Sequence, residues 1–290
     1  MTKREKGIRG RKGEHAAYGT AESPRRRLIA LDVDGTIITH GGHLDARVHA
    51  AITACVSNGH HVVIATGRSV VATMPVLARL GIGHGYAVCS NGAVTLRIDP
   101  RRPKGYKILE KVTFDPRPAL TLLRDELPEA LVAVEDLGRG FMVSSPFPDG
   151  ELMGDQRVVP WDVLIAKRAT RVTLRMPDAE PEAFMAHIER IGLHEVSYAV
   201  GWTAWLDINP EGVSKGSALE QLRRRLQVEP CDTVAVGDQR NDIEMLQWAA
   251  RGVAMGNAPE QVQAIADEVT GTVEEAGLAT VLESVLDSTG

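Results

Sequence analysis

The sequence predicts an α/β protein: a Rossmann-like, doubly wound parallel sheet into which a smaller α+β unit is inserted. Short apolar runs at 28–31, 61–65, 86–89 and 233–236 are typical of strands buried on both faces of a parallel sheet. Helical patterns alternate with these runs, and this order implies parallel pairing with right-handed crossovers. Between about 98 and 205 the strand patterns alternate more and the helices stand apart, as in an antiparallel α+β unit.

These patterns divide the chain into three parts. We expect a core domain of residues 28–97 and 206–290 and an inserted α+β domain of residues 98–205. Residues 1–27 carry nine Lys or Arg against three Glu and show no apolar periodicity, so we expect a basic, disordered leader or a start-site artefact. Such a leader could touch anionic surfaces.

In the first half of the core, a helix signal follows each strand. Asp45 is a candidate N-cap for a helix that Asn58-Gly59 ends. Ser69 is a candidate cap for the next helix, which Gly81 stops. After the strand at 86–89, Ser90-Asn91-Gly92-Ala93 is a turn signal.

The insert is expected to open with a linker-like stretch at 100–105 and to hold a Pro/Gly-rich loop at 146–160. Its expected helices cover 116–127 and a segment that Asp178 caps. Its expected strands are 131–135, 141–144, 171–176, 196–200 and 203–208.

The second half of the core returns to the first pattern. Ser214 is a candidate N-cap for a helix through Leu226, and strands are expected at 233–236 and 252–255. Thr272 and Glu275 form the pattern of a capping box for the last helix.

Composition limits the class of protein. The chain of 290 residues is 43% hydrophobic and 24% charged, with a formal net charge of −5, as in soluble globular proteins. Outside the leader it is acidic, which gives no reason to expect nucleic-acid binding, and no apolar run approaches a membrane span. The three cysteines lie far apart without metal-ligand spacing, so we expect a reduced, cytoplasmic protein.

The segment Asp32-Val33-Asp34-Gly35-Thr36 directly follows the first predicted strand. It could be a simple Asx-type turn. However, ligands of open α/β sheets bind at the carboxyl ends of strands, and two carboxylates there are costly to bury unless they are paired or bind a metal.

Other strand and helix ends supply partners for these carboxylates. Thr66-Gly67 follows the second strand, Asp238 and Asp242 follow the strand at 233–236, and Lys215 lies in the first turn of a helix, where a cation is unfavourable unless an anion is near. Carboxylates with one Lys and one hydroxyl, without His or Cys, form a hard-oxygen site that suits Mg²⁺ and phosphate oxygens.

With these motifs in this order, the sequence resembles the haloacid dehalogenase (HAD) superfamily, and its large insert resembles that of the Cof-type phosphatases with a C2-class cap. The resemblance covers residues from about 28 to 285. It rests on the following motifs: Asp-Val-Asp-Gly-Thr, Ala-Thr-Gly-Arg, Ser-Asn-Gly-Ala, Gly-Val-Ser-Lys-Gly and Gly-Asp-Gln-Arg-Asn-Asp. It implies the HAD fold with an α+β cap and a phosphatase of small phosphorylated metabolites such as sugar phosphates.

The resemblance also implies roles for individual residues. Asp32 would be the nucleophile that forms an aspartyl-phosphate, and Asp34 would be the general acid and then the base. Lys215 would offset negative charge, and Asp242 would support Lys215 or a metal-bound water. The Mg²⁺ ion would bind the Asp32 carboxylate, the Asp34 carbonyl and the Asp238 carboxylate. The expected substrate-binding residues are Thr66, Gly67, Asn91 and Asn241.

Alternatives remain open at this point. A phosphomutase of the phosphomannomutase type shares the nucleophile motif and the cap class, and a glycosyl-phosphate phosphatase is a narrower variant. The third alternative is a metabolite-binding protein without catalytic activity. Trp202 and Trp205 could stack on a sugar or a base, or pack a hinge strand. Because the cap is long enough to cover the site, we expect a monomer or a weak homo-oligomer.

Overall fold

The computed structural model describes residues 26–191, 196–200 and 204–288. The expectations for residues 1–25 of the leader and for Trp202 lie outside the described residues. Within the described ranges, no helix is both long enough and apolar enough to cross a lipid bilayer.

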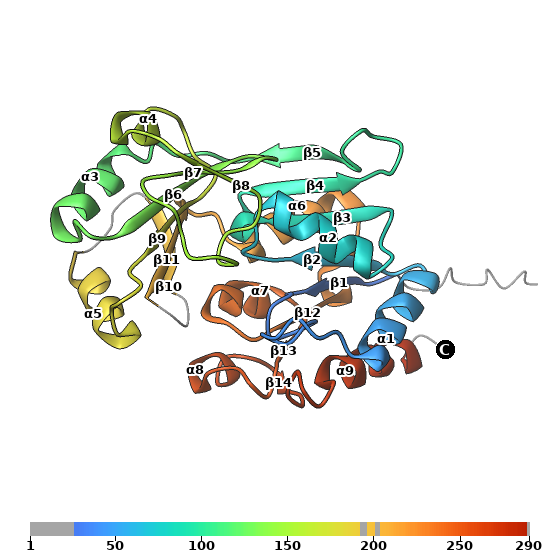
Figure 1. Cartoon of the computed structure of the whole chain (residues 1–290). Helices are drawn as coiled ribbons and strands as arrows, with labels where there is room; N and C mark the ends of the chain where they lie inside the picture. Colours follow the sequence, from blue (N-terminus) through green and yellow to red (C-terminus); the bar gives the residue numbers. More distant parts are fainter. Residues whose placement is uncertain (1–25, 192–195, 201–203, 289–290) are drawn as a thin grey trace, which may run out of the picture.

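An eight-stranded sheet forms the main layer of the core, in the order β14-β13-β12-β1-β2-β3-β4-β5 (Figure 1). All of its pairings are parallel except those of β4 with β3 and with β5. The predicted parallel α/β core is therefore confirmed. The strands of this sheet are β1 (Leu28–Leu31), β2 (His61–Ala65), β3 (Gly85–Cys89), β4 (Val94–Ile98), β5 (Tyr106–Lys111), β12 (Thr233–Gly237), β13 (Arg251–Ala254) and β14 (Glu268–Val269).

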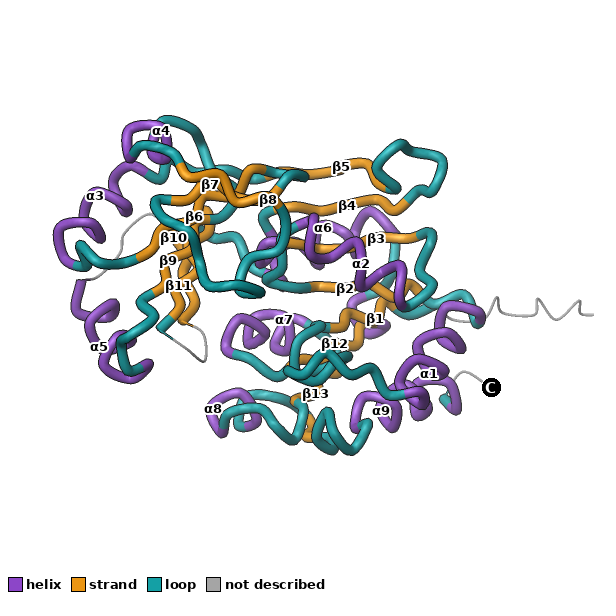
Figure 2. Tube along the Cα trace, viewed as in Figure 1, coloured by secondary structure: helices purple, strands orange, loops and turns teal. Residues whose placement is uncertain are grey.

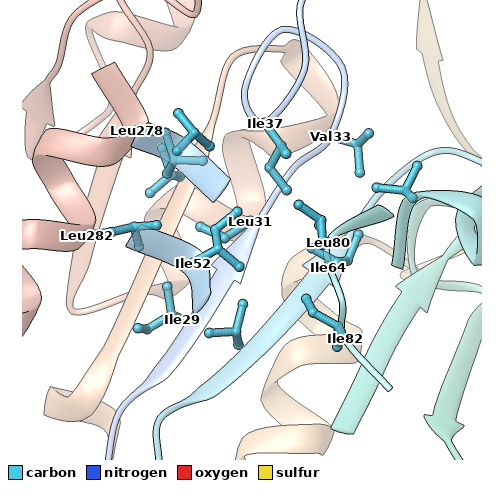
Figure 3. Packing of buried hydrophobic residues seen from close by; sticks show 14 of the residues in the cluster. Ile29, Leu31, Val33, Ile37, Ile52, Ile64, Leu80, Ile82, Leu278 and Leu282 are labelled. Atoms are coloured by element: carbon cyan, nitrogen blue, oxygen red, sulfur yellow. The ribbon is translucent and has the colours of Figure 1, made fainter. Parts of the chain in front are cut away.

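Helices cover both faces of this sheet, because successive strand side chains point to opposite faces. Ile29 and Leu31 pack toward α1 (Ala46–Ser57), α2 (Val70–Arg79) and α9 (Gly277–Asp287), as Figure 3 shows for part of this cluster. Leu28 and Ala30 pack toward the other face. That face is covered by α6 (Lys215–Leu226), α7 (Ile243–Trp248) and α8 (Glu260–Gln263).

The predicted caps fix where three core helices begin. The side chains of Asp45, Ser69 and Ser214 each accept a hydrogen bond from a backbone N–H in the first turn of the following helix. The prediction for the last helix is wrong. Thr272 and Glu275 do bond to each other, but they form a turn before α9, whose N-cap is Ala276.

A second sheet, called the cap sheet below, lies beside the core (Figure 2). Its order is β10-β11-β9-β6-β7-β8, and all of its pairs are antiparallel except β7 with β8. Its strands are β6 (Leu131–Asp136), β7 (Gly140–Val143), β8 (Asp155–Val158), β9 (Val172–Arg175), β10 (Val196–Val200) and β11 (Trp205–Pro210). Its helices are α3 (Arg117–Glu126), α4 (Trp161–Ile165) and α5 (Pro181–Ile191).

Two local predictions for the insert are wrong. Residues 100–105 do not form a linker but close the β4–β5 hairpin, where the N–H of Gly105 donates to the carbonyl of Arg102. The stretch 146–160 contains β8, whose exposed polar residues gave no strand pattern. Strand β5 joins the main sheet, and β11 runs to Pro210 in the cap sheet. The domain limits at 97/98 and 205/206 stay predictions.

The two faces of the cap sheet differ in chemistry. One face packs against α3, α4 and α5 through apolar side chains such as Leu174, Leu206 and Ile208. The alternate positions of β11 carry Trp205, Asp207 and Asn209 and so face the other way. The cap sheet therefore turns a mixed polar and aromatic face away from its own helices.

The central strands carry much of the stability of the core, which gives a first test. Ile64 of β2 is fully buried, so Ile64→Ala should lower the free energy of unfolding by about 2 to 5 kcal/mol. Val56 of α1 is 42% exposed, and Val56→Ala should change it by less than about 0.5 kcal/mol. Urea unfolding at fixed pH measures both, and equal effects of the two changes would contradict this packing.

Candidate active site

The site is built at the carboxyl end of β1, in the middle of the main sheet. The chain turns sharply after Asp32 through Gly35, whose φ is +81°, a conformation that favours glycine. A Cβ at Gly35 would lie 2.2 Å from Oδ2 of Asp238. The turn therefore brings the loop after β1 directly against the carboxylate that follows β12.

Lys215 lies fully buried between two carboxylates. Its Nζ is 2.6 Å from Oδ1 of Asp32 and 2.6 Å from Oδ1 of Asp242. Burial lowers the pKa of Lys215, but the charges of Asp242 and Asp32 outweigh it and hold the pKa above its usual range. The ammonium therefore stays charged, and its position in the first turn of α6 is explained by these two anions.

Asp238 and Asp242 are held by the loop between β12 and α7. Oδ2 of Asp242 accepts hydrogen bonds from the backbone N–H groups of Asp238 and Gln239, at 3.0 and 2.9 Å. Asp238 accepts from the Thr36 hydroxyl at 3.2 Å and from the Asn257 side chain at 3.3 Å. Burial, with the nearby charge of Asp242, raises the pKa of Asp238 to about 6.

Three carboxylates crowd this point. One oxygen each from Asp32, Asp238 and Asp242 lies within 4.8 Å of the others, and all three residues are buried. Burial raises the pKa of Asp32 well above its ordinary value, and the charges of the other two carboxylates add to this, although Lys215 opposes it. One ammonium among three carboxylates leaves a deficit of positive charge, so the donor set fits a hard divalent cation such as Mg²⁺.

Asp34 takes a different position from Asp32. Its side chain is 46% exposed, and its two oxygens accept hydrogen bonds from Arg68 Nε at 2.7 Å and Nη2 at 2.5 Å. Arg68 belongs to the loop after β2, so this pair joins the loops of two neighbouring strands. The sequence singled out both residues but gave no signal that they pair.

The predicted substrate-binding residues form a second group. The Thr66 hydroxyl accepts from the N–H of Arg68 at 3.2 Å, and the Asn91 N–H donates to the Thr66 carbonyl. Asn241 Nδ2 donates to Asn91 Oδ1 at 3.0 Å, and that same oxygen would be 2.9 Å from a Cβ at Gly67. The structure thus brings all four residues together.

A cavity of about 540 Å³ opens between this group and the cap sheet. Asp32, Asp34 and Thr66 line it from the core. Asp207 of β11 and Arg171, which directly precedes β9, line it from the cap, and no motif in the sequence marks either residue. For Asp207 the available signal was the alternation of Trp205, Asp207 and Asn209 with apolar Leu206 and Ile208, because it marks a strand whose two faces differ.

The fold and the site together define an enzyme with a capped, doubly wound core. The sequence pattern of the haloacid dehalogenase-like hydrolases matches residues 29–129 and 154–282. The chain belongs to this family.

Several relatives match this chain over nearly their full length, and their names describe phosphatases. The chain is 27% identical to phosphatase YwpJ of Bacillus subtilis, over 90% of this chain and all of that protein. It is 28% identical to the HMP-PP phosphatase of Serratia proteamaculans, over 90% of this chain and 96% of that protein. The structure of the phosphatase BT1666 from Bacteroides thetaiotaomicron matches with a TM-score of 0.73 at 26% identity, over 93% of this chain and 98% of that one. The protein is a phosphatase of this family.

The raised pKa of Asp238 predicts how this carboxylate affects stability. Because the folded pKa of about 6 exceeds the ordinary value of 3.8, ionised Asp238 costs stability above pH 6, and this cost vanishes as the pH falls below 4. Asp238→Asn should therefore raise the stability of the metal-free protein at pH 7.5 by about 1 to 3 kcal/mol, and not at pH 4.

The same variant should lose its response to the cation. Thermal unfolding with and without MgCl₂ at pH 7.5 should show a higher melting temperature with Mg²⁺ in the wild type but not in Asp238→Asn. Asp125→Asn, an exposed change in α3, should behave as the wild type. An equal rise with Mg²⁺ in all three proteins would contradict the proposed cation site.

Proposed function

We propose that this protein is a Mg²⁺-dependent phosphatase that hydrolyses a small phosphate monoester, such as a sugar phosphate, through an aspartyl-phosphate on Asp32. The observation that carries the proposal is the buried Lys215 ammonium, 2.6 Å from the Asp32 carboxylate, beside two further carboxylates. A carboxylate that attacks a phosphate dianion must first be relieved of the repulsion between the two anions. Lys215 and a bound cation supply that positive charge.

The first step is attack by Asp32 on phosphorus. The new bond joins a carboxylate oxygen of Asp32 to phosphorus, the bond from phosphorus to the ester oxygen breaks, and the alcohol leaves. Asp32, the backbone carbonyl of Asp34 and Asp238 would hold Mg²⁺, which neutralises charge on the phosphoryl oxygens when bound. Asp242 keeps Lys215 in place, since its Oδ1 lies 2.6 Å from Nζ.

Asp34 moves the protons. It gives a proton to the leaving oxygen, and its carboxylate then takes one from the water that hydrolyses the aspartyl-phosphate. Its partial exposure, 46%, leaves it accessible to substrate and water. Each of its oxygens accepts one hydrogen bond from Arg68 and keeps a further lone pair, so Asp34 can exchange a proton with the leaving oxygen or with water while it stays paired with Arg68.

The second group of residues binds the substrate. The Thr66 hydroxyl and the backbone of Gly67 would contact the phosphoryl oxygens, because both residues line the cavity beside Asp32. Asn91 and Asn241 bond to each other at 3.0 Å and hold this loop in place. The substrate alcohol would then extend toward the cap sheet.

Two kinds of substrate are candidates. The relatives named HMP-PP phosphatase act on that compound, and it is one candidate here. The cap contributes both aromatic and charged side chains to the cavity, including Trp205 and Asp207, and this mixture suits a sugar phosphate. A reduced cytoplasmic setting is part of the proposal, and the free thiols of the buried Cys55 and Cys89 support it. A monomer or a weak homo-oligomer is also part of it.

Substitution of the two aspartates after β1 should change the kinetics in different ways. Asp32→Asn should lower kcat by more than about 10⁴-fold on every substrate, because it removes the nucleophile. Asp34→Asn should lower kcat by about 10² to 10⁴-fold on alkyl phosphates. With p-nitrophenyl phosphate, whose leaving group needs no proton, it should give a rapid burst of nitrophenol followed by slow turnover.

Rapid-quench and steady-state phosphate release, with and without Mg²⁺, measure these effects. Asp45→Asn, which changes only the partly exposed N-cap of α1, serves as the control and should keep wild-type kinetics. Turnover by Asp32→Asn near the wild-type rate would rule out the aspartyl-phosphate route.

A further inference from the structure

The loop of residues 66–68, which follows β2, takes one of its hydrogen bonds from the cap. Its first and third carbonyls accept from backbone N–H groups of the core, those of Asn91 and Ser90, at 3.1 and 2.9 Å. The carbonyl between them, that of Gly67, accepts from Nη1 of Arg171 at 2.5 Å. Because Arg171 directly precedes β9, the middle of this core loop is held by a cation of the cap.

The glycine in the middle makes this contact important. Gly67 has no Cβ, so side-chain sterics do little to fix the peptide group between Gly67 and Arg68. A hydrogen bond from a cation can fix it, because such bonds are about twice as strong as neutral ones. The peptide is trans, so its N–H points away from its carbonyl. That N–H, of Arg68, donates to the Thr66 hydroxyl at 3.2 Å.

The Thr66 hydroxyl extends this arrangement into the cavity. Its oxygen accepts from the N–H of Arg68, so its own hydrogen remains to donate to another group. Thr66 lines the cavity together with Asp32. Because hydrogen bonds in a chain polarise one another, a cation at the start of this chain strengthens the donor at its end.

The guanidinium of Arg171 is itself fixed within the cap. It is buried, with Nη1 3.4 Å from Oδ2 of Asp207, and it lies over the ring of Phe141 at 5.4 Å from the ring centroid. Asp207 in turn accepts from the Thr173 hydroxyl at 2.7 Å and from the Trp205 indole N–H at 3.1 Å. The position of the guanidinium is therefore set by the cap sheet.

From these contacts, and resting on the proposed phosphatase function, we infer that Arg171 is a positioning residue for the phosphoryl group. Through Gly67 it orients the Thr66 hydroxyl toward the phosphoryl oxygens. Loss of the Nη1 contact therefore weakens binding of the phosphoryl group itself, whatever alcohol that group carries. A cap residue that touched only the alcohol part would leave binding of inorganic phosphate unchanged.

The test is inhibition by inorganic phosphate of p-nitrophenyl phosphate hydrolysis, with the full-length protein and Mg²⁺. Arg171→Gln keeps a nitrogen near the position of Nε but is too short to place a donor where Nη1 lies. It should raise the inhibition constant of phosphate by about tenfold, as expected for the loss of one charge-assisted hydrogen bond. It should also lower kcat/KM for p-nitrophenyl phosphate and for glucose 6-phosphate by factors that agree within about threefold.

The matched control removes a different cation from the cap. Arg157 of β8 has a side chain that is 60% exposed, lies 3.9 Å from Asp136 and is outside the cavity lining. Arg157→Gln should therefore leave the inhibition constant of phosphate and both values of kcat/KM unchanged.

A double-mutant cycle tests whether Arg171 acts through the Thr66 hydroxyl. Thr66→Val removes this hydroxyl and keeps a similar shape. In the Thr66→Val protein, Arg171→Gln should change the inhibition constant of phosphate by less than about twofold, because the group that it positions is gone. Arg171→Met, which also lacks Nη1, is a second variant and should give the same results in both backgrounds.

The outcomes separate this inference from the proposed function. Suppose that Asp32→Asn abolishes hydrolysis of p-nitrophenyl phosphate, but folded Arg171→Gln and Arg171→Met bind phosphate as the wild type does. The inference would then be overturned and the phosphatase would stand. Equal effects of Arg171→Gln with and without the Thr66 hydroxyl, or a loss confined to glucose 6-phosphate, would overturn it as well. No hydrolysis of either phosphate ester by the wild type would contradict both.

Discussion

The ammonium group of Lys215 lies inside the protein between the carboxylates of Asp32 and Asp242, without access to water. A charge in such a place is tolerated only when it is paired and hydrogen-bonded, so the three groups must stay together. They come from three elements, and Lys215 is 183 residues from Asp32 along the chain. The pairing of Lys215 with the two carboxylates thus constrains where β1, β12 and the start of α6 lie relative to one another. The other parts of the site are arranged around it.

A second set of contacts positions the cap over this centre. The Ser90 hydroxyl donates to Glu135 of β6 at 2.7 Å, and Asn91 donates to Asn209 of β11 at 3.2 Å. Arg171 donates to the carbonyl of Gly67 at 2.5 Å. These contacts tie the cap sheet to the loops that follow β2 and β3. The core half and the cap half of the cavity are therefore held together, and in the proposed function the core half carries the chemistry while the cap half lies over the rest of the substrate.

The centre of the core was predictable because β1, β2, β3 and β12 are apolar runs that each end in a polar turn, and Asp32, Thr66 and Asp238 stand at those turns. The edge strands β5 and β14 were not predicted, because their exposed polar residues give no buried-strand pattern. The pairing of Asp34 with Arg68 was not predictable, since it depends on side-chain geometry between two loops. In the cap, β8 is a short strand of exposed polar residues, and its pairing is set by tertiary contacts rather than by its own pattern. Arg171 and Asp207 were missed for a similar reason, because only the packed sheet shows which face meets the cavity.

Covalent chemistry at Asp32 is the central step of the proposed mechanism. The most direct test is acid quench of the wild-type protein during turnover of p-nitrophenyl phosphate with Mg²⁺, followed by peptide mass spectrometry. We expect one phosphoryl group on the peptide that contains Asp32, present only during turnover and absent without Mg²⁺. Steady turnover with the phosphoryl group on another residue would contradict this mechanism. The Asp34→Asn variant should accumulate the aspartyl-phosphate, so steady turnover of this variant with no phosphoryl group on the protein would contradict it as well.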